Sequence, residues 1–230
     1  MGNRKSPLMT IFKPKFVTFD CYGTLTRFQM VEMTRQIFAD RVPTDRMDDF
    51  IRDFATYRLD EILGPWKPYR DVIVNAVQRT AKLWGIKATI DESLSYYHAV
   101  PTWGPHPDVP AGLAKVAKEI PLVILSNASN DQIQQNVAKL GAPFHAVFTA
   151  EMAQAYKPRM QAFEYMFDQL GCRPEEVAHV SSSYRYDLMT AHDMRCGKCI
   201  FVNRRHEPHI PYYGALEIQD IGGLASALGL

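Results

Sequence analysis

Four groups of polar side chains in this sequence have residue types that can do chemistry, and each stands beside a short apolar run or ahead of a helical stretch. The groups are Asp20 with Thr24, Ser126 with Asn127, Lys157, and Ser182 with Asp187. A carboxylate can attack a substrate directly, and a neighbouring lysine keeps it ionised, as a nucleophile requires. A hydroxyl and an amide can hold a small carboxylate or a departing anion. We therefore interpret Asp20 as a nucleophile and the other groups as its partners.

These groups can meet only if the chain brings the ends of several strands together. Short apolar runs alternate with amphipathic stretches, which predicts an α/β fold with a Rossmann-like, doubly wound parallel sheet. The predicted strands are residues 16–20, 122–126, 146–148, 177–181 and 199–202, and the predicted helices of this core are residues 111–119, 131–140, 160–170 and 186–195. In such a sheet the carboxyl ends of the strands face one crevice, so we expect the four groups there.

The first two predicted strands are separated by about a hundred residues, far more than an ordinary crossover needs. This stretch contains no clear strand pattern, and its helical patterns cover residues 28–40, 45–63, 69–84 and 90–97. We therefore predict an inserted helical cap at residues 27–103 and a core formed by residues 1–26 and 104–230. The start of the chain, Met1–Ser6, has no apolar stretch behind it, and we expect a disordered leader there rather than a signal peptide.

The run Asp20-Cys21-Tyr22-Gly23-Thr24-Leu25 resembles the corresponding motif of the haloacid dehalogenase superfamily. Most members of that superfamily are phosphatases with Asp-x-Asp at this point, where the first Asp attacks phosphorus and the second protonates the leaving alcohol. Tyr22 takes the place of the second Asp, and a phenol with an ordinary pKa of about 10 cannot be that acid at neutral pH. A halide leaves without a proton. The chain therefore resembles the branch of type II L-2-haloacid dehalogenases.

This resemblance implies hydrolysis of short 2-haloacids to 2-hydroxy acids through an ester on Asp20 that water then cleaves. The residues that it makes catalytic are Asp20, Thr24, Lys157, Ser182 and Asp187. The residues that it assigns to substrate binding are Cys21, Tyr22, Ser126, Asn127 and Tyr186. Asp187 would orient Lys157 or activate the water, and both roles can hold together. The structural alternative for each of these polar residues is a turn or a helix cap.

The family also uses an arginine of the cap, which reaches into the crevice to meet the halide and the substrate carboxylate. Arg52, within Phe50-Ile51-Arg52-Asp53-Phe54, is the best match. Arg58 is the second choice, because gaps make the alignment of the cap loose. The alternative is an arginine on the surface of the cap.

The stretch from Ser181 to Asp187 departs from the dehalogenases, which resemble Ser-Ser-Asn-x-Trp-Asp here. Counted back from Asp187, the Asn falls on Tyr184 and the Trp on Tyr186, so an aromatic wall is kept and the amide that would position the hydrolytic water is lost. A single carboxylate in this stretch, with Tyr22 in place of another, supplies too few oxygens for magnesium. We therefore predict no metal and no other cofactor.

Composition sets the remaining expectations. The net charge is +1 and no apolar run is long enough to cross a bilayer, so we expect no nucleic acid or membrane partner. We expect a cytoplasmic enzyme, with a homodimer left open, whose partners are a small 2-haloacid and its halide. Two other functions stay open: a phosphatase or phosphonatase of the same superfamily, and a non-catalytic descendant that binds small carboxylates.

Overall fold

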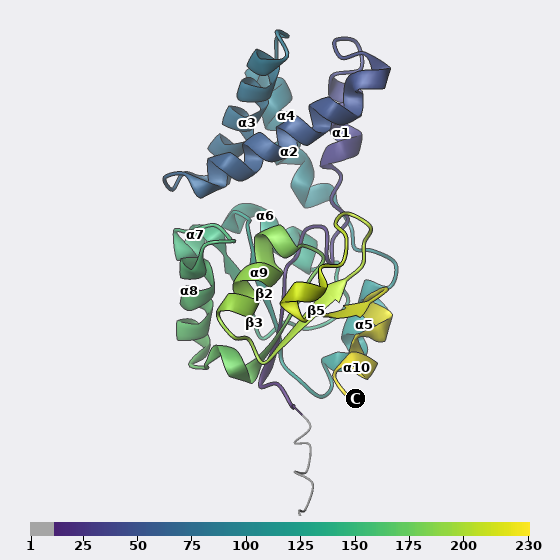
Figure 1. Ribbon diagram of the computed structural model, residues 1–230, viewed down its shortest axis with the longest axis vertical. Coiled ribbons are helices and arrows are strands. Elements are labelled where there is room, and N and C mark those ends of the chain that lie inside the picture. Colours follow the sequence, from purple (N-terminus) through teal and green to yellow (C-terminus); the bar gives the residue numbers. More distant parts are fainter. Residues whose placement is uncertain (1–11) are drawn as a thin grey trace, which may run out of the picture.

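The computed structural model describes residues 12–230. The leader expected at Met1–Ser6 and the first part of the predicted core segment lie outside the described residues. Figure 1 shows a sheet wrapped by helices, with a separate group of helices above it.

The sheet has six strands, all parallel, in the order β3-β2-β1-β4-β5-β6. Their bounds are β1 Phe16–Phe19, β2 Leu122–Ser126, β3 Ala146–Thr149, β4 Val177–Ser181, β5 Lys198–Val202 and β6 Leu216–Ile218. This confirms the predicted doubly wound sheet, because the order reverses between the neighbours β1 and β4. Ligands of such sheets bind beyond the carboxyl ends of the strands at this reversal. The edge strand β6 was not predicted, since three residues give too short a pattern.

Both faces of the sheet are covered, which explains why the central strands read as continuous apolar runs. Val17 and Phe19 point to one face, where they pack with residues of α5 and α10. Phe16 points to the other face and packs with residues of α8 and α9. The helices of the core are α5 Val109–Val116, α6 Asn130–Val137, α7 Ala150–Ala153, α8 Met160–Leu170, α9 Met189–Asp193 and α10 Leu224–Ala227.

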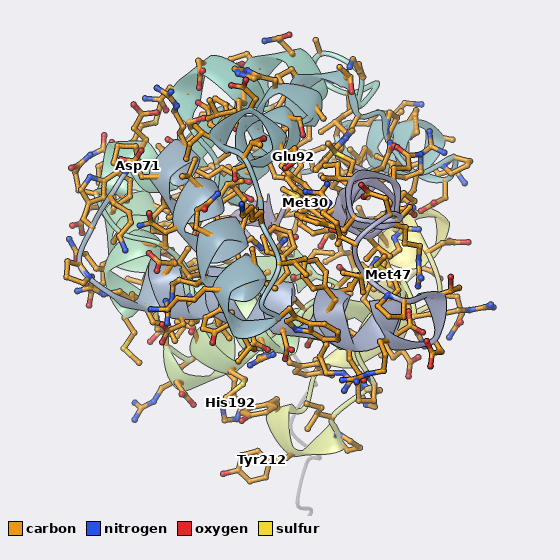
Figure 2. All side chains as sticks on the ribbon, turned by 90° about the horizontal axis from the view of Figure 1, so that it is seen from above. Met30, Met47, Asp71, Glu92, His192 and Tyr212 are labelled. Carbon is orange, nitrogen blue, oxygen red and sulfur yellow. The ribbon has the colours of Figure 1, made fainter. Side chains whose placement is uncertain are left out.

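Four helices lie between β1 and β2 and form a layer above the carboxyl ends of the strands (Figure 1). They are α1 Met30–Ile37, α2 Met47–Leu63, α3 Tyr69–Leu83 and α4 Ile90–Ala99. We call residues 27–103 the cap. The cap has an apolar core of its own, in which Phe50 and Tyr96 are fully buried. Viewed from the cap side, Figure 2 shows Met30, Met47 and Glu92 on this layer and Tyr212 projecting beyond it from the core.

Several hydrogen bonds and ring contacts join the cap to the core, and they include contacts at both ends of the space that the cap covers. The chain leaves and returns side by side, because Arg27 N–H donates to the Gly104 carbonyl at 2.9 Å. A second contact lies at the far end of α2, where the ring of Tyr156 stacks on Trp66 with centroids 4.9 Å apart. The Tyr156 hydroxyl also donates to the Lys67 carbonyl at 2.9 Å. The cap is therefore held at both ends of the space that it covers.

The segment after β4 differs from its prediction. A single helix was predicted over residues 186–195, but the chain first makes a π-helical turn at Tyr184–Leu188, and α9 begins only at Met189. Leu188 N–H donates to the Ser183 carbonyl at 3.1 Å, five residues back. A π turn holds one more residue than an α-helical turn, and such turns are frequent at functional sites.

Candidate active site

Asp20 stands one residue beyond β1, at the carboxyl end of the strand, and shares a pocket with residues of the cap. Its backbone N–H still donates to the Val180 carbonyl of β4 at 3.1 Å, so the strand fixes where the side chain starts. The chain then turns sharply at Gly23, whose φ of +96° suits glycine. This turn brings Thr24 back, and the Thr24 hydroxyl donates to Asp20 Oδ2 at 2.7 Å. Asp20 is 8% exposed, and the bond from Thr24 orients its carboxylate.

Lys157 reaches Asp20 from the opposite side. Its Nζ donates to Asp20 Oδ1 at 2.9 Å, to Asp187 Oδ1 at 2.7 Å and to the Leu125 carbonyl at 2.7 Å. An ammonium group has three protons, so each one has an acceptor within the protein. Lys157 is 1% exposed and is therefore a fixed internal charge shared by two carboxylates.

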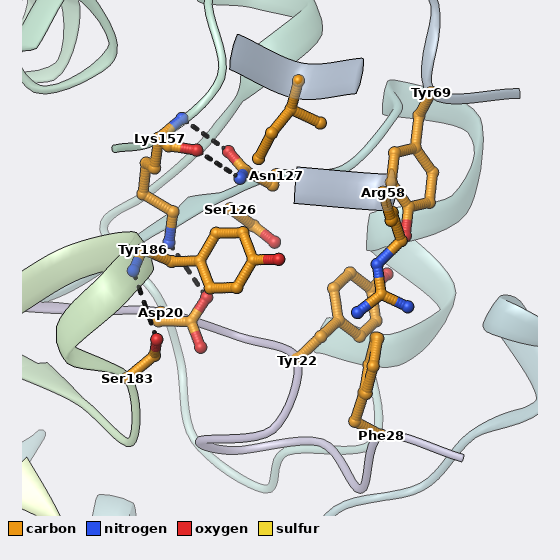
Figure 3. Close-up of a pocket in the computed structure, with 11 residues that line it drawn as sticks. Asp20, Tyr22, Phe28, Arg58, Tyr69, Ser126, Asn127, Lys157, Ser183 and Tyr186 are labelled. Carbon is orange, nitrogen blue, oxygen red and sulfur yellow. Dashed lines mark hydrogen bonds and ion pairs between the residues drawn. The ribbon is translucent and has the colours of Figure 1, made fainter. Parts of the chain in front are cut away.

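A cavity of about 110 Å³ opens in front of Asp20 (Figure 3). Its floor is polar, and its walls come largely from aromatic and aliphatic side chains of the cap and the core. The lining residues are Asp20, Tyr22, Phe28, Arg58, Ile62, Tyr69, Ser126, Asn127, Lys157, Ser183 and Tyr186. The Ser126 hydroxyl is buried and has no hydrogen-bond partner among residues 12–230, so it can serve a bound molecule. The cavity suits a small molecule with one polar end.

Comparisons with known proteins agree with this architecture. Residues 14–194 match a family described as "haloacid dehalogenase-like hydrolase".

The chain belongs to the haloacid dehalogenase-like hydrolases.

An (S)-2-haloacid dehalogenase of Xanthobacter autotrophicus is 27% identical to this hydrolase over 172 residues, which are 74% of this chain and 68% of that protein. A solved dehalogenase with an intermediate complex superposes with a TM-score of 0.79 at 20% identity, covering 95% of this chain and 98% of the other. The L-2-haloacid dehalogenase from X. autotrophicus gives a TM-score of 0.75 at 22% identity, covering 94% and 98%. Similarity at these identities shows a shared fold, and the predicted superfamily is confirmed by the family match.

The three buried charged groups at the floor of the cavity, Asp20, Lys157 and Asp187, have pKa values shifted in different directions. Burial raises the pKa of Asp20, and the nearby Lys157 offsets this only in part. Burial also raises the pKa of Asp187, but Lys157 and His179 outweigh burial, so this pKa lies below its ordinary value. Burial lowers the pKa of Lys157, and the two carboxylates more than reverse that effect. Asp187 and Lys157 therefore stay charged at neutral pH, and Asp20 is the carboxylate that protonates more readily.

The predicted cap arginine requires a correction. Arg52 points into solvent with 72% of its side chain exposed, and it pairs with Asp49 at 3.1 Å on its own helix. Arg58 lines the cavity instead, with its guanidinium 4.8 Å from the centre of the Phe28 ring and 5.5 Å from that of Phe54. Six residues along a helix turn a side chain by well over one full turn, so the two arginines of α2 face different directions. The second choice made from the sequence is the residue that the structure places in the pocket.

Tyr22 and Cys21 lie on opposite sides of the chain after Asp20. The Tyr22 ring lines the cavity as predicted, and its hydroxyl donates to Asn136 Oδ1 at 2.8 Å. Burial raises the pKa of Tyr22, so the phenol holds its proton tightly, and the hydroxyl already donates that proton to Asn136. The Cys21 side chain points away into the sheet core, where its Sγ lies 3.6 Å from Thr26 Oγ1. The substrate contact predicted for Cys21 is therefore not available to its side chain.

Ser182 and Asn127 form hydrogen bonds with Thr24 and Lys157 rather than pointing to the centre of the cavity. Ser182 N–H donates to Thr24 Oγ1 at 2.9 Å, and its hydroxyl lies 3.1 Å from the same atom, so it steadies Thr24. Asn127 brackets the backbone of Lys157: its Oδ1 accepts from Lys157 N–H and its Nδ2 donates to the Lys157 carbonyl, both at 2.8 Å (Figure 3). The Asn127 amide thus has a structural task, although part of the side chain faces the cavity.

The π turn determines which residues of the fourth polar group face the cavity, and they differ from those expected from the alignment. Tyr184, expected at the position of the family Asn, is fully buried on the far side of the turn and packs against Phe201, with its hydroxyl 2.9 Å from His209 Nδ1. Ser183 faces the cavity in its place, and Tyr186 forms the expected aromatic wall. Glu207 accepts from the Ser183 hydroxyl at 2.6 Å and from Tyr184 N–H at 2.8 Å, which holds the turn.

Several residues of the site carried no signal in the sequence. Phe28 and Ile62 belong to the cap, and only the fold shows which side of the cap faces Asp20. His179, within β4, also went unnoticed, because a single polar residue inside an apolar run has no spacing that marks it. Within residues 12–230, no group of three or more His, Cys, Asp or Glu side chains is arranged to hold a metal. No helix in the same range is long and apolar enough to span a membrane.

Proposed function

We propose that this hydrolase cleaves the carbon–halogen bond of short 2-haloacids and releases 2-hydroxy acids. One observation carries the proposal: a buried carboxylate, Asp20, is held by Lys157 and Thr24 at the floor of a small apolar cavity. The neutral, hydrogen-bonded phenol of Tyr22 stands where a phosphatase keeps its proton donor. The arrangement supplies a nucleophile without a leaving-group acid, which suits a halide because a halide departs as a weak base.

In the first step a carboxylate oxygen of Asp20 attacks carbon 2 of the haloacid. The new oxygen–carbon bond forms as the carbon–halogen bond breaks, and the halide leaves with the bonding electron pair. Arg58 is suited to receive the substrate carboxylate and the halide, since it lines the cavity and makes no salt bridge within the described part of the chain. The unpartnered Ser126 hydroxyl offers a further donor to the carboxylate.

In the second step water attacks the carbonyl carbon of the Asp20 ester. The product is the 2-hydroxy acid, Asp20 is regenerated, and one proton is released for each halide. Lys157 and Thr24 donate to the two oxygens of Asp20 and so can stabilise the oxyanion of the tetrahedral intermediate. Asp187 orients Lys157 at 2.7 Å. Its Oδ2 has no partner among the described residues but is buried outside the cavity lining, so it is the proposed proton acceptor only for a water that reaches it from the cavity.

The test is the release of free halide from chloro-, bromo- and fluoroacetate and from the two enantiomers of 2-chloropropionate, with and without EDTA. We expect halide and hydroxy acid in equal amounts, and the same rate in the presence of the chelator. Hydrolysis of phosphate esters that EDTA abolishes and magnesium restores would contradict the proposal and support the phosphatase alternative. Binding of short carboxylates with no halide release would support a non-catalytic protein.

A further inference from the structure

His179 is a polar residue in an unusual place. It lies in the middle of β4, next to β1 in the sheet, and its side chain is fully buried. The edge of the Phe163 ring lies against it, with ring centroids 5.2 Å apart. An apolar residue would fill this position without burying polar nitrogen atoms, which is costly unless they are hydrogen-bonded. The two ring nitrogens must therefore have partners, and both do.

The partners of His179 lead to the nucleophile. Thr18, directly across on β1, places its Oγ1 2.7 Å from Nδ1. On the other side Nε2 lies 3.0 Å from Asp187 Oδ1. A carboxylate oxygen only accepts hydrogen bonds, so Nε2 carries a proton and donates it to Asp187. In the neutral imidazole this leaves Nδ1 to accept from the Thr18 hydroxyl, which fixes the tautomer.

The same oxygen of Asp187 also accepts from Lys157, which in turn donates to Asp20. A continuous row of contacts thus runs from Thr18 in the sheet, through His179, Asp187 and Lys157, to the nucleophile. His179 does not line the cavity, so it cannot touch a bound substrate.

We propose that His179 is a positioning residue, which holds the Asp187 carboxylate in the orientation that directs Lys157 onto Asp20, with Thr18 fixing the imidazole. The proposal rests on the covalent function proposed above and adds a residue to it. An imidazole anchored at both nitrogens prevents rotation of the Asp187 carboxylate, and a fixed carboxylate gives Lys157 one position.

The two chemical steps depend on this support to different degrees. Before the reaction Lys157 is held by two carboxylates, Asp20 and Asp187. Once Asp20 becomes a neutral ester, its attraction for the ammonium falls, and Asp187 is the remaining carboxylate of the pair. Lys157 must then stay in place to stabilise the oxyanion of ester hydrolysis. His179 therefore matters more for the second step than for the first.

The experiment compares four variants of the full-length chain. His179→Phe keeps a ring and removes the donor, whereas His179→Gln can restore an N–H near the position of Nε2. Thr18→Val removes the hydroxyl with little change in shape. Thr80→Val is the matched control, because Thr80 is also fully buried and bonded, to the Ala76 carbonyl at 2.7 Å, but lies in the cap helix α3. Rapid quenching gives the halide burst, steady-state assays give kcat and KM, and intact mass gives the fraction of enzyme present as ester.

We expect His179→Phe to keep a burst rate within about threefold of the wild type and to lower kcat about tenfold. KM should fall by a similar factor and the ester should accumulate, because slowing only the second step lowers kcat and KM together. His179→Gln should recover most of kcat. Thr18→Val should lower kcat in the same direction by a smaller factor, and should have no further effect in the His179→Phe background, because it acts through His179. Thr80→Val should leave kcat unchanged even where it lowers stability.

The opposite results are equally clear. An unchanged kcat in His179→Phe, an equal loss in both steps, or a failure of Gln to recover activity would overturn the proposal. If His179→Phe does not fold, Thr18→Val decides, and a wild-type kcat in that variant would overturn the proposal too. Failure of the parent function looks different: a wild-type protein that releases no halide refutes both proposals, whereas normal wild-type turnover with the wrong variant pattern refutes only the role of His179.

Discussion

Arg58→Ala, compared with Arg52→Ala, tests whether the pocket found in the structure is the place where the substrate binds. Both residues belong to α2, and both substitutions remove one positive charge from the same helix. Arg58 lines the cavity and lies over Phe28, whereas the Arg52 side chain is 72% exposed and pairs with a neighbour on the helix surface. Any effect of net charge is thus the same in the two variants, and a difference reports position.

The magnitude follows from the environments of the two side chains. A charged donor aimed at developing negative charge in a largely enclosed site contributes on the order of 10²-fold or more to the rate. We therefore expect Arg58→Ala to lower kcat/KM by about 10²-fold, with both a higher KM and a lower kcat, because the guanidinium meets the carboxylate in the ground state and the halide in the transition state. An exposed ion pair contributes about 0–1 kcal/mol, so Arg52→Ala should stay within about threefold of the wild type.

The assay is steady-state halide release from chloroacetate and 2-chloropropionate, with thermal unfolding of each variant as a check on folding. Loss of the Arg58 contact with the Phe28 ring costs about 1 kcal/mol of stability, which is too little to unfold a chain of this size. Arg58→Lys should recover part of the activity, since it returns the charge without the planar fork. Equal losses in the Arg52 and Arg58 variants, or a wild-type kcat/KM in Arg58→Ala, would refute the reasoning.

Three further outcomes are expected. Asp20→Asn should reduce halide release to a trace while thermal unfolding stays close to that of the wild type; turnover that persists in a variant shown by mass to be free of deamidation would show that another group attacks. In a single turnover in ¹⁸O-labelled water, the product hydroxyl should carry unlabelled oxygen and Asp20 should gain the label; labelled product would mean direct attack by water. The pH profile of kcat/KM should lose activity as the pH falls through the pKa of Asp20, which burial holds above its ordinary value. Because the ionised form is the proposed nucleophile, this loss should begin at a higher pH than for an exposed aspartate. Lys157→Met should move the loss to a still higher pH, since Lys157 lowers the pKa of Asp20. A profile that stays flat down to the ordinary carboxyl range would contradict the burial argument.

The sheet and its carboxyl edge could be predicted from the sequence because strands buried on both faces must be apolar along their whole length. For the same reason Asp20, at the end of such a run, stood out. The position of Arg58 could not be predicted, since an amphipathic helix shows which face is apolar but not which neighbour that face meets. The π turn was missed because a turn of five residues is too short to show a periodicity of its own, yet at this turn Ser183 faces the cavity and Tyr184 does not.

The contact between Tyr156 and the cap determines how a displacement of the cap would reach Lys157. Tyr156 is attached to Trp66 and to the Lys67 carbonyl, and it is joined by one peptide bond to Lys157. A movement of the cap at this end would pull on Tyr156. The Asn127 side chain forms hydrogen bonds with both the N–H and the carbonyl of Lys157, so it fixes the backbone between Tyr156 and the Lys157 ammonium group. A displacement of the cap at Trp66 would therefore be resisted at Asn127 before it reached the ammonium group of Lys157.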